Sequence, residues 1–222
     1  MIRAVIFDLD GTLVDAFAGH LWAYDEAAKK LNMPKMTRKV FSKYYGQSGT
    51  EIIRQFLKKP FVDKTVEELA RVKREFFSSG GSTFVVALPS VVDFISELEK
   101  RKIPMAVASS ARKVEIEMML QKIGVRNKIQ EIVSADDIKN SKPHPEIFLK
   151  AAEKLNVAPK DCVVFEDSPW GVMAAKAAGM KCIAVATGTT SKKDLKKLAP
   201  DIVLGSLEEL LPPKLDKILI SL

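Results

Sequence analysis

The sequence has few cysteines, no long apolar run and no basic segment interleaved with aromatic residues. Its two cysteines, Cys162 and Cys182, each begin a predicted buried strand, so we interpret both as packing residues rather than as a disulfide. No run of about 18 apolar residues is present, which excludes a membrane-spanning helix and a membrane partner. Because no basic-then-apolar secretory pattern opens the chain, the predicted location is cytoplasmic.

The charge balance is basic, with a formal net charge of +7 over 222 residues. Much of the excess lies on faces such as Lys192-Lys193 and Lys196-Lys197, with no aromatic residues between the lysines, so nucleic-acid binding is not expected. A positive field can still concentrate phosphorylated metabolites. The composition, 47% hydrophobic and 28% charged, is typical of a globular protein, and the length allows one ordinary domain with a smaller insert. A monomer is the favoured oligomeric state.

Short apolar runs alternate with helical patterns from about residue 86 onward. This alternation predicts right-handed crossovers and a parallel sheet covered by helices on both faces, joined by a first strand at 3–8. The predicted class is α/β with a doubly wound parallel sheet. The later strands are expected at 104–109, 130–133, 162–166, 182–186 and 202–204, and the helices at 90–101, 112–123, 145–156, 169–178 and 191–199.

The segment before residue 80 has a different pattern. Its apolar residues, such as Leu21, Tyr24 and Ala28, recur at helical spacing, and no convincing strand appears. We therefore predict a small all-helical domain over 16–83, inserted into a core domain formed by 1–15 and 84–222. Two adjacent linkers are expected near 14–18 and 78–86. The second linker contains Ser78-Ser79-Gly80-Gly81-Ser82, a composition typical of a flexible hinge.

Two carboxylates follow the first predicted strand. Asp8 and Asp10 come directly after the apolar run 4–7 and are followed by Gly11-Thr12. Because alternate strand residues point to the same side, the two aspartates can share one site at the strand end. Anions held so close repel one another unless a cation lies between them, and a hard dication with oxygen ligands meets that need. The pattern predicts a Mg²⁺ site.

The segment from Ile6 to Asp15 resembles the first motif of the haloacid dehalogenase-like hydrolases. Three later segments resemble the other motifs of this family in the expected order: Ser109-Ser110 after an apolar run, Lys142 before Pro143, and Glu166-Asp167 after another apolar run. The resemblance spans nearly the whole chain. It is greatest to the β-phosphoglucomutase and phosphoglycolate phosphatase-like branch, in which a helical cap follows the first strand of a Rossmann-like core.

The resemblance implies roles for these residues. Asp8 would attack phosphorus to give an aspartyl-phosphate, and Asp10 would protonate the leaving oxygen and later deprotonate water. The Mg²⁺ ligands would be the Asp8 carboxylate, the Asp10 main-chain carbonyl and Asp167, with Glu166 ligating directly or through water. The phosphoryl group would be held by Thr12, Ser109, Ser110 and Lys142.

His20 lies on the predicted first cap helix, where β-phosphoglucomutase-like members carry a histidine near the nucleophile. It is therefore a possible cap residue in contact with substrate, although a packed or surface histidine is the commoner case. Two positions depart from the mutase pattern. Ala16 replaces a polar residue, and Gly49 replaces an arginine that holds a second phosphate in the mutases.

The function predicted from these features is a Mg²⁺-dependent phosphatase of small phosphorylated metabolites. The alternative within the fold is a sugar-phosphate mutase, which the missing arginine disfavours. A catalytically idle binding module, from a different functional class, is disfavoured because Asp8, Asp10, Lys142 and Asp167 are all present. Phosphonate hydrolysis would need a cap lysine in an apolar setting, and no lysine stands out in this way.

Overall fold

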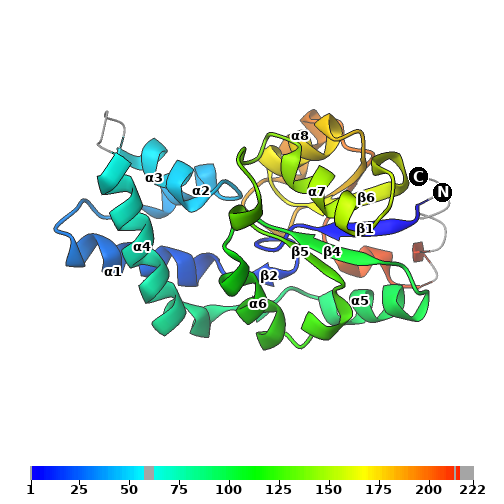
Figure 1. The fold of residues 1–222 in the computed structure, drawn as a ribbon, viewed down its shortest axis with the longest axis horizontal. Coiled ribbons are helices and arrows are strands. Elements are labelled where there is room, and N and C mark those ends of the chain that lie inside the picture. The colour runs from blue at the N-terminus through cyan, green and yellow to red at the C-terminus, as the bar shows by residue number, and fades with distance from the viewer. Residues whose placement is uncertain (1, 58–62, 213, 216–222) are drawn as a thin grey trace.

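A computed structural model describes residues 2–57, 63–212 and 214–215. The chain forms an α/β part at one end of the molecule and a helical part at the other end (Figure 1). The remaining residues, 1, 58–62, 213 and 216–222, belong to the predicted core and cap domains but lie outside the described residues.

A six-stranded parallel sheet forms the centre of the α/β part, which confirms the predicted fold class. Its strand order is β5-β4-β1-β6-β7-β8, so the first strand lies in the interior of the sheet. Each observed strand lies within one residue of the predicted position at either end. The strands are β1 (Ala4–Phe7), β4 (Met105–Ala108), β5 (Glu131–Val133), β6 (Cys162–Glu166), β7 (Lys181–Val185) and β8 (Ile202–Leu204).

Both faces of the sheet are buried, because alternate residues of each strand enter two separate cores. Val5 and Phe7 pack into one core with Phe94, whereas Ala4 and Ile6 pack into the other. The first core is covered by α5 (Val91–Lys100) and α6 (Lys113–Lys122). The second is covered by α7 (Glu146–Lys154), α8 (Pro169–Ala177) and α9 (Lys192–Lys197), and Figure 1 shows α7 and α8 opposite α5 and α6.

The helical part has its own hydrophobic core. Tyr24, Phe41, Ile53 and Leu69 are buried there, away from the two cores of the sheet. The residues described between 16 and 80 contain helices and no strand, as the apolar spacing predicted. The helices are α1 (Phe17–Lys30), α2 (Arg38–Tyr44), α3 (Gly49–Leu57) and α4 (Asp63–Ser79).

The connection between the two parts differs from the predicted flexible linkers. β2 (Val14–Asp15) and β3 (Val86–Ala87) pair as an antiparallel ribbon, and residues Gly81–Phe84 form a 3₁₀ turn after α4. A methyl group on Gly19 would lie 2.2 Å from the carbonyl oxygen of Gly81. The glycine-rich composition therefore permits close contact between α1 and this turn, and the predicted linker is helical over 78–79 and 81–84.

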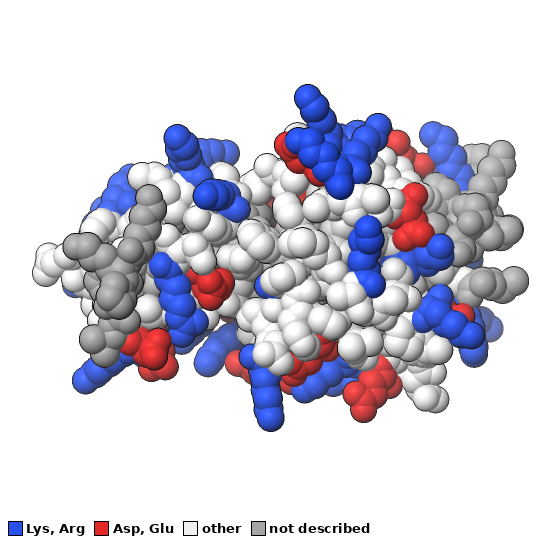
Figure 2. Space-filling view, turned by 90° about the horizontal axis from the view of Figure 1, so that it is seen from above, with Lys and Arg blue, Asp and Glu red and all other residues white. Residues whose placement is uncertain are grey.

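The cysteines and the distribution of charged side chains agree with what the sequence composition predicted. Cys162 and Cys182 are buried free thiols, as predicted. Lys and Arg side chains are scattered over both parts of the molecule, with Asp and Glu side chains between them (Figure 2). Among the described helices, none combines the length and apolar character needed to cross a membrane.

Candidate active site

The carboxyl ends of three neighbouring strands bring the predicted site residues together. Asp8 follows β1, Ser109 follows β4, and Glu166-Asp167 stand at the end of β6. Hydrogen bonding continues past two of these strands, since the Asp8 amide donates to the Phe165 carbonyl at 2.9 Å and the Ser109 amide to the Val133 carbonyl at 3.0 Å. The side chains are therefore fixed at the edge where open parallel sheets bind ligands.

Three carboxylates crowd this edge. Oxygen atoms of Asp8, Glu166 and Asp167 lie within 4.8 Å of one another, and all three residues are buried. Burial raises the pKa of Asp8 to about 8, with Glu166 and Asp10 adding to the rise and Lys142 opposing it. Burial, followed by the charges of Glu166 and Asp8, raises the pKa of Asp167 well above its usual value. The cluster therefore requires positive charge to remain ionised.

Lys142 supplies one positive charge inside this cluster. Its Nζ lies 2.6 Å from Asp8 Oδ1 and 2.6 Å from Glu166 Oε1, and its side chain has no exposed surface. Burial lowers the pKa of Lys142, but the two carboxylates outweigh burial and raise it overall. The other oxygen of Glu166 accepts a hydrogen bond from the Ser168 amide at 2.8 Å. Both oxygens of Glu166 are thus engaged within the protein.

Asp167 is left without a matching cation, and its surroundings fit a metal ion. Its Oδ1 accepts a hydrogen bond from the Thr12 hydroxyl at 3.3 Å, whereas its Oδ2 is buried with no hydrogen-bond partner among the described residues. A methyl group on Gly188 would lie 1.7 Å from Oδ2, and one on Gly11 would lie 2.3 Å away. The unpartnered oxygen and the nearby Asp8 carboxylate are the hard donors that Mg²⁺ prefers.

A cavity of about 220 Å³ opens beside this cluster, between the helical part and the sheet. Asp8, Asp10, Ser109 and Ser110 line it from the sheet side. The Thr12 hydroxyl faces Asp167 instead, so the structure does not place this predicted phosphate-binding residue on the cavity wall. A cavity of this size can hold a small metabolite.

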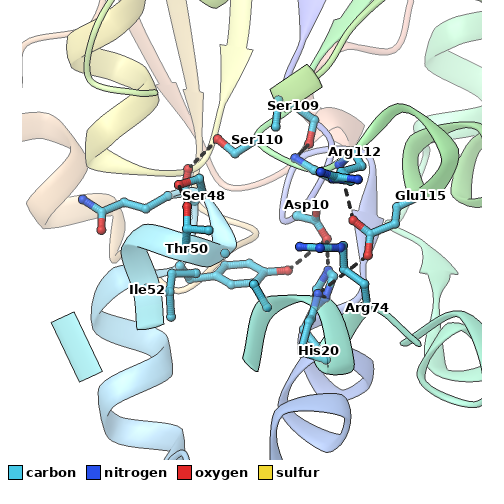
Figure 3. Close-up of a pocket in the computed structure, with 18 of the residues that line it drawn as sticks. Asp10, His20, Ser48, Thr50, Ile52, Arg74, Ser109, Ser110, Arg112 and Glu115 are labelled. Carbon is cyan, nitrogen blue, oxygen red and sulfur yellow. Dashed lines mark hydrogen bonds and ion pairs between the residues drawn. The ribbon is translucent and has the colours of Figure 1, made fainter. Parts of the chain in front are cut away.

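Asp10 is linked to the helical part by a chain of hydrogen bonds (Figure 3). His20 Nε2 lies 3.0 Å from Asp10 Oδ1, and Lys73 Nζ lies 2.8 Å from His20 Nδ1. Because an ammonium group can only donate, Nδ1 accepts from Lys73 and the Nε2 hydrogen is directed to Asp10. Tyr45 also donates to Asp10 Oδ1, at 3.4 Å. Side chains from α1 and α4 thereby fix the second aspartate of the motif.

These contacts determine the charge of Asp10. Burial raises the pKa of Asp10, but His20, Lys73 and the hydroxyl of Tyr45 together outweigh burial and lower it. Asp10 therefore remains a carboxylate, in contrast to the upward shift at Asp8. The two aspartates of the motif differ in protonation because their neighbours differ.

Lys73 was missed from the sequence, and the expectation that no cap lysine has an apolar setting was wrong. Only 7% of its surface is exposed, and its ammonium group lies 4.8 Å from the ring centre of Phe77. The signal was present in α4, because Lys73 stands four residues after Leu69 and four before Phe77, on the apolar face. His20 stacks on the same Phe77 ring, with centroids 4.0 Å apart.

Further polar residues of the cavity wall were also missed, because nothing in the local sequence marks them. Arg74 comes from α4, while Arg112 and Glu115 come from the start of α6. Their proximity depends on how the helical part sits against the sheet. The neighbouring Gly49 leaves room on its side of the cavity, where a methyl group would meet only the Tyr24 hydroxyl at 3.5 Å.

Comparison with known proteins gives a consistent result. The family model described as haloacid dehalogenase-like hydrolase matches residues 5–185. Phosphoglycolate phosphatase of Escherichia coli K12 is 28% identical over 234 residues, covering 95% of this chain and 92% of that protein.

Two solved structures share the fold at similar identity. β-Phosphoglucomutase from Clostridium difficile superposes with a TM-score of 0.85 at 27% identity, covering 100% of this chain and 98% of that one. CbbY from Rhodobacter sphaeroides, in complex with phosphate, gives a TM-score of 0.85 at 28% identity, covering 97% and 100% of the two chains.

The position of Lys142 leads to a stability prediction. Replacing Lys142 by Met leaves the carboxylates of Asp8 and Glu166 buried without a cation, so we expect the free energy of unfolding to fall by about 3–5 kcal/mol. Urea unfolding at neutral pH in EDTA would measure the loss. The control is Lys193→Met on the exposed surface of α9, for which a change below about 0.5 kcal/mol is expected. Equal stability of the two variants would contradict this account of Lys142.

Proposed function

Since the chain belongs to the haloacid dehalogenase-like hydrolases, we propose that it is a phosphatase that hydrolyses small phosphorylated metabolites at the Asp8 site. One observation carries the proposal most strongly. Asp8, an acid already paired with Lys142, lies on the wall of a cavity and beside a second buried acid, Asp167, whose Oδ2 has no partner among the described residues. The naming of relatives as phosphatases supports the same reaction.

Asp8 is the proposed nucleophile. An oxygen of its carboxylate attacks phosphorus, the bond from phosphorus to the ester oxygen breaks, and the leaving oxygen takes a proton from Asp10. Asp10 is ionised in the free protein, so it must take up that proton when the substrate anion approaches. Water then attacks the resulting aspartyl-phosphate after losing a proton to Asp10, which releases inorganic phosphate and restores Asp8. The contact of Lys142 with Asp8 supports a role in offsetting the negative charge that gathers as the two anions approach.

Mg²⁺ is the proposed cofactor. Asp8, Asp167 and the main-chain carbonyl of Asp10 would hold it, with Glu166 supporting the site through Lys142. When bound, the ion would screen the crowded carboxylates and polarise the phosphoryl oxygens. Ser109 and Ser110 would position the phosphoryl group from the cavity wall, and Thr12 would orient Asp167 through its hydroxyl.

The helical segment 16–83 is proposed to act as a cap domain over this site. Three hydrogen bonds between the two parts support this role, since each would be lost if the parts separated. Besides the His20–Asp10 contact, the Ser110 hydroxyl donates to the Gly46 carbonyl at 3.3 Å and the Thr189 hydroxyl to the Ser42 carbonyl at 3.0 Å. Opening would admit substrate, and closing would position His20 and Lys73 against Asp10.

A sugar-phosphate mutase is the second candidate, favoured by the similarity to β-phosphoglucomutase and by the position of His20 beside Asp10. Hydrolysis is preferred for two reasons. The chain has Gly49 where the mutases hold a second phosphate with arginine, and Ala16, which is buried, offers no polar side chain beside the catalytic aspartates.

The proposed nucleophile can be tested by the substitution Asp8→Asn. An amide cannot attack phosphorus, so we expect kcat for p-nitrophenyl phosphate to fall by at least about a hundredfold, or roughly 2.7 kcal/mol of barrier. Asp93→Asn, an exposed aspartate on α5, is the matched control and should keep its activity. Retention of more than about a tenth of the activity by a folded Asp8→Asn variant would refute covalent catalysis by Asp8.

Metal removal tests the proposed cofactor. EDTA should abolish hydrolysis of p-nitrophenyl phosphate, Mg²⁺ should restore it, and Ca²⁺ should restore it poorly, because Ca²⁺ takes more ligands at longer distances and disturbs the attack geometry. Phosphate release would be measured after dialysis against EDTA and after titration with each ion. Full activity of the dialysed enzyme in EDTA would exclude a metal-dependent reaction.

Phosphorus NMR distinguishes the phosphatase from the mutase. With β-glucose 1-phosphate as substrate, with and without a bisphosphate primer, we expect inorganic phosphate to accumulate and no glucose 6-phosphate to form. The reason is that position 49, where the mutases carry an arginine that holds the second phosphate during transfer, is glycine. Primer-dependent isomerisation with little free phosphate would overturn this choice.

A further inference from the structure

Two arginines from different parts of the molecule line the cavity that also contains Asp8. Arg74 projects from α4 of the helical part, and Arg112 stands at the start of α6 on the sheet side. Figure 3 shows both guanidinium groups on the same side of the cavity, beyond Asp10 and near Glu115. Neither arginine has a role in the proposed chemistry at Asp8.

Arg74 lacks the partner that a half-buried guanidinium ordinarily has. Among the described residues, it forms no ion pair and no hydrogen bond of its side chain. Burial, and next to it the positive charge of Arg112, lowers the pKa of Arg74. Both guanidinium groups face the same cavity, and that of Arg74 has no partner among the described residues. N–H donors are therefore available to bind an anion.

The acids near the two arginines form no strong ion pair with them. Arg112 contacts Asp136 at 3.3 Å, but both side chains are about half exposed, so the pair is weak. Glu115 is 5% exposed. Its Oε2 accepts from the Arg112 amide at 3.3 Å, and its Oε1 lies 3.9 Å from Lys73 without a hydrogen bond. Lys73 interacts with Asp10 as well as with Glu115, and among the described residues neither Glu115 nor Asp136 forms an ion pair with Arg74.

We infer that Arg74 and Arg112 together bind a second anionic group, a carboxylate or a phosphate, on the substrate whose phosphoryl group lies at Asp8. This inference rests on the proposed function. A planar guanidinium binds a carboxylate or a phosphate in the same way, through paired hydrogen bonds to two oxygen atoms. The positive charge for the second anionic group would therefore come from Arg74 in α4 and from Arg112 at the start of α6. Position 49, where the mutases carry an arginine, is glycine.

The origin of the two arginines also determines when the second group can be held. Because Arg74 belongs to the helical part and Arg112 to the sheet part, one anion can contact both only while the two parts are together. A substrate with a second anionic group therefore favours the closed arrangement, in which Lys73 and His20 reach Asp10. Both anionic groups of the substrate would lie within one cavity of about 220 Å³.

The test compares pairs of substrates that differ only in the second anion. For the carboxylate, 2-phosphoglycolate is paired with 2-hydroxyethyl phosphate; for the phosphate, ribulose 1,5-bisphosphate is paired with ribulose 5-phosphate. We expect kcat/KM to be at least about tenfold higher for the two-anion member of one pair, which identifies the anion. In Arg74→Ala, Arg74→Gln and Arg112→Ala, this ratio should fall below about threefold, mainly through KM.

Arg71→Ala is the matched control, because Arg71 lies on the same helix but is exposed and paired with Glu68 and Glu75. It should keep the wild-type ratio, and circular dichroism with thermal unfolding would confirm that each variant is folded. The inference would be overturned, and the proposed function left intact, by either of two results. One is hydrolysis of both members of each pair with equal kcat/KM, and the other is a preference for the two-anion substrate that survives in the folded Arg74 and Arg112 variants. Failure to release phosphate from every substrate in Mg²⁺ would instead overturn the proposed function itself.

Discussion

The crowding of buried carboxylates around Lys142 is the constraint on which the rest of this structure depends. Asp8, Glu166 and Asp167 lie within 4.8 Å of one another, where burial and mutual repulsion both oppose ionisation. A single lysine ammonium, 2.6 Å from two of these acids, offsets only part of that cost. The cluster persists because parallel strands on either side of it are fixed by the buried cores, so the carboxylates cannot move apart.

Much of this arrangement could be predicted from the sequence because it depends on local patterns. Apolar runs mark the strands, and an acid directly after a run in a parallel sheet must lie at the carboxyl edge. Asp8, Ser109 and Asp167 were located in this way, and the family resemblance, now confirmed, added Lys142. The short ribbon β2–β3 was not predicted, since two residues per strand give no detectable alternation.

The remaining residues of the cavity could not be predicted because their proximity is tertiary. Lys73 lies on an apolar helix face, where a lysine is normally placed to reach solvent, and its burial depends on His20 and Phe77 from other positions. Arg74 and Arg112 line one cavity only because of how the helical part packs against the sheet. The close packing of the glycines at 80 and 81 could not be predicted for a related reason, since composition does not show which atoms lie beside a glycine.

The division of the chain into two parts separates the reaction from the choice of substrate. The residues that would act on phosphorus come from the strand ends and from the turn that carries Lys142. Arg74 and the contacts that fix Asp10 come instead from α1, from α4 and from Tyr45 just after α2. Substitutions in the helical part can therefore change which leaving group is accepted without disturbing the acidic cluster. The exception is His20, which belongs to the helical part but contacts Asp10. Closure of the helical part over a substrate therefore affects the charge of Asp10, the residue that must exchange protons with the substrate.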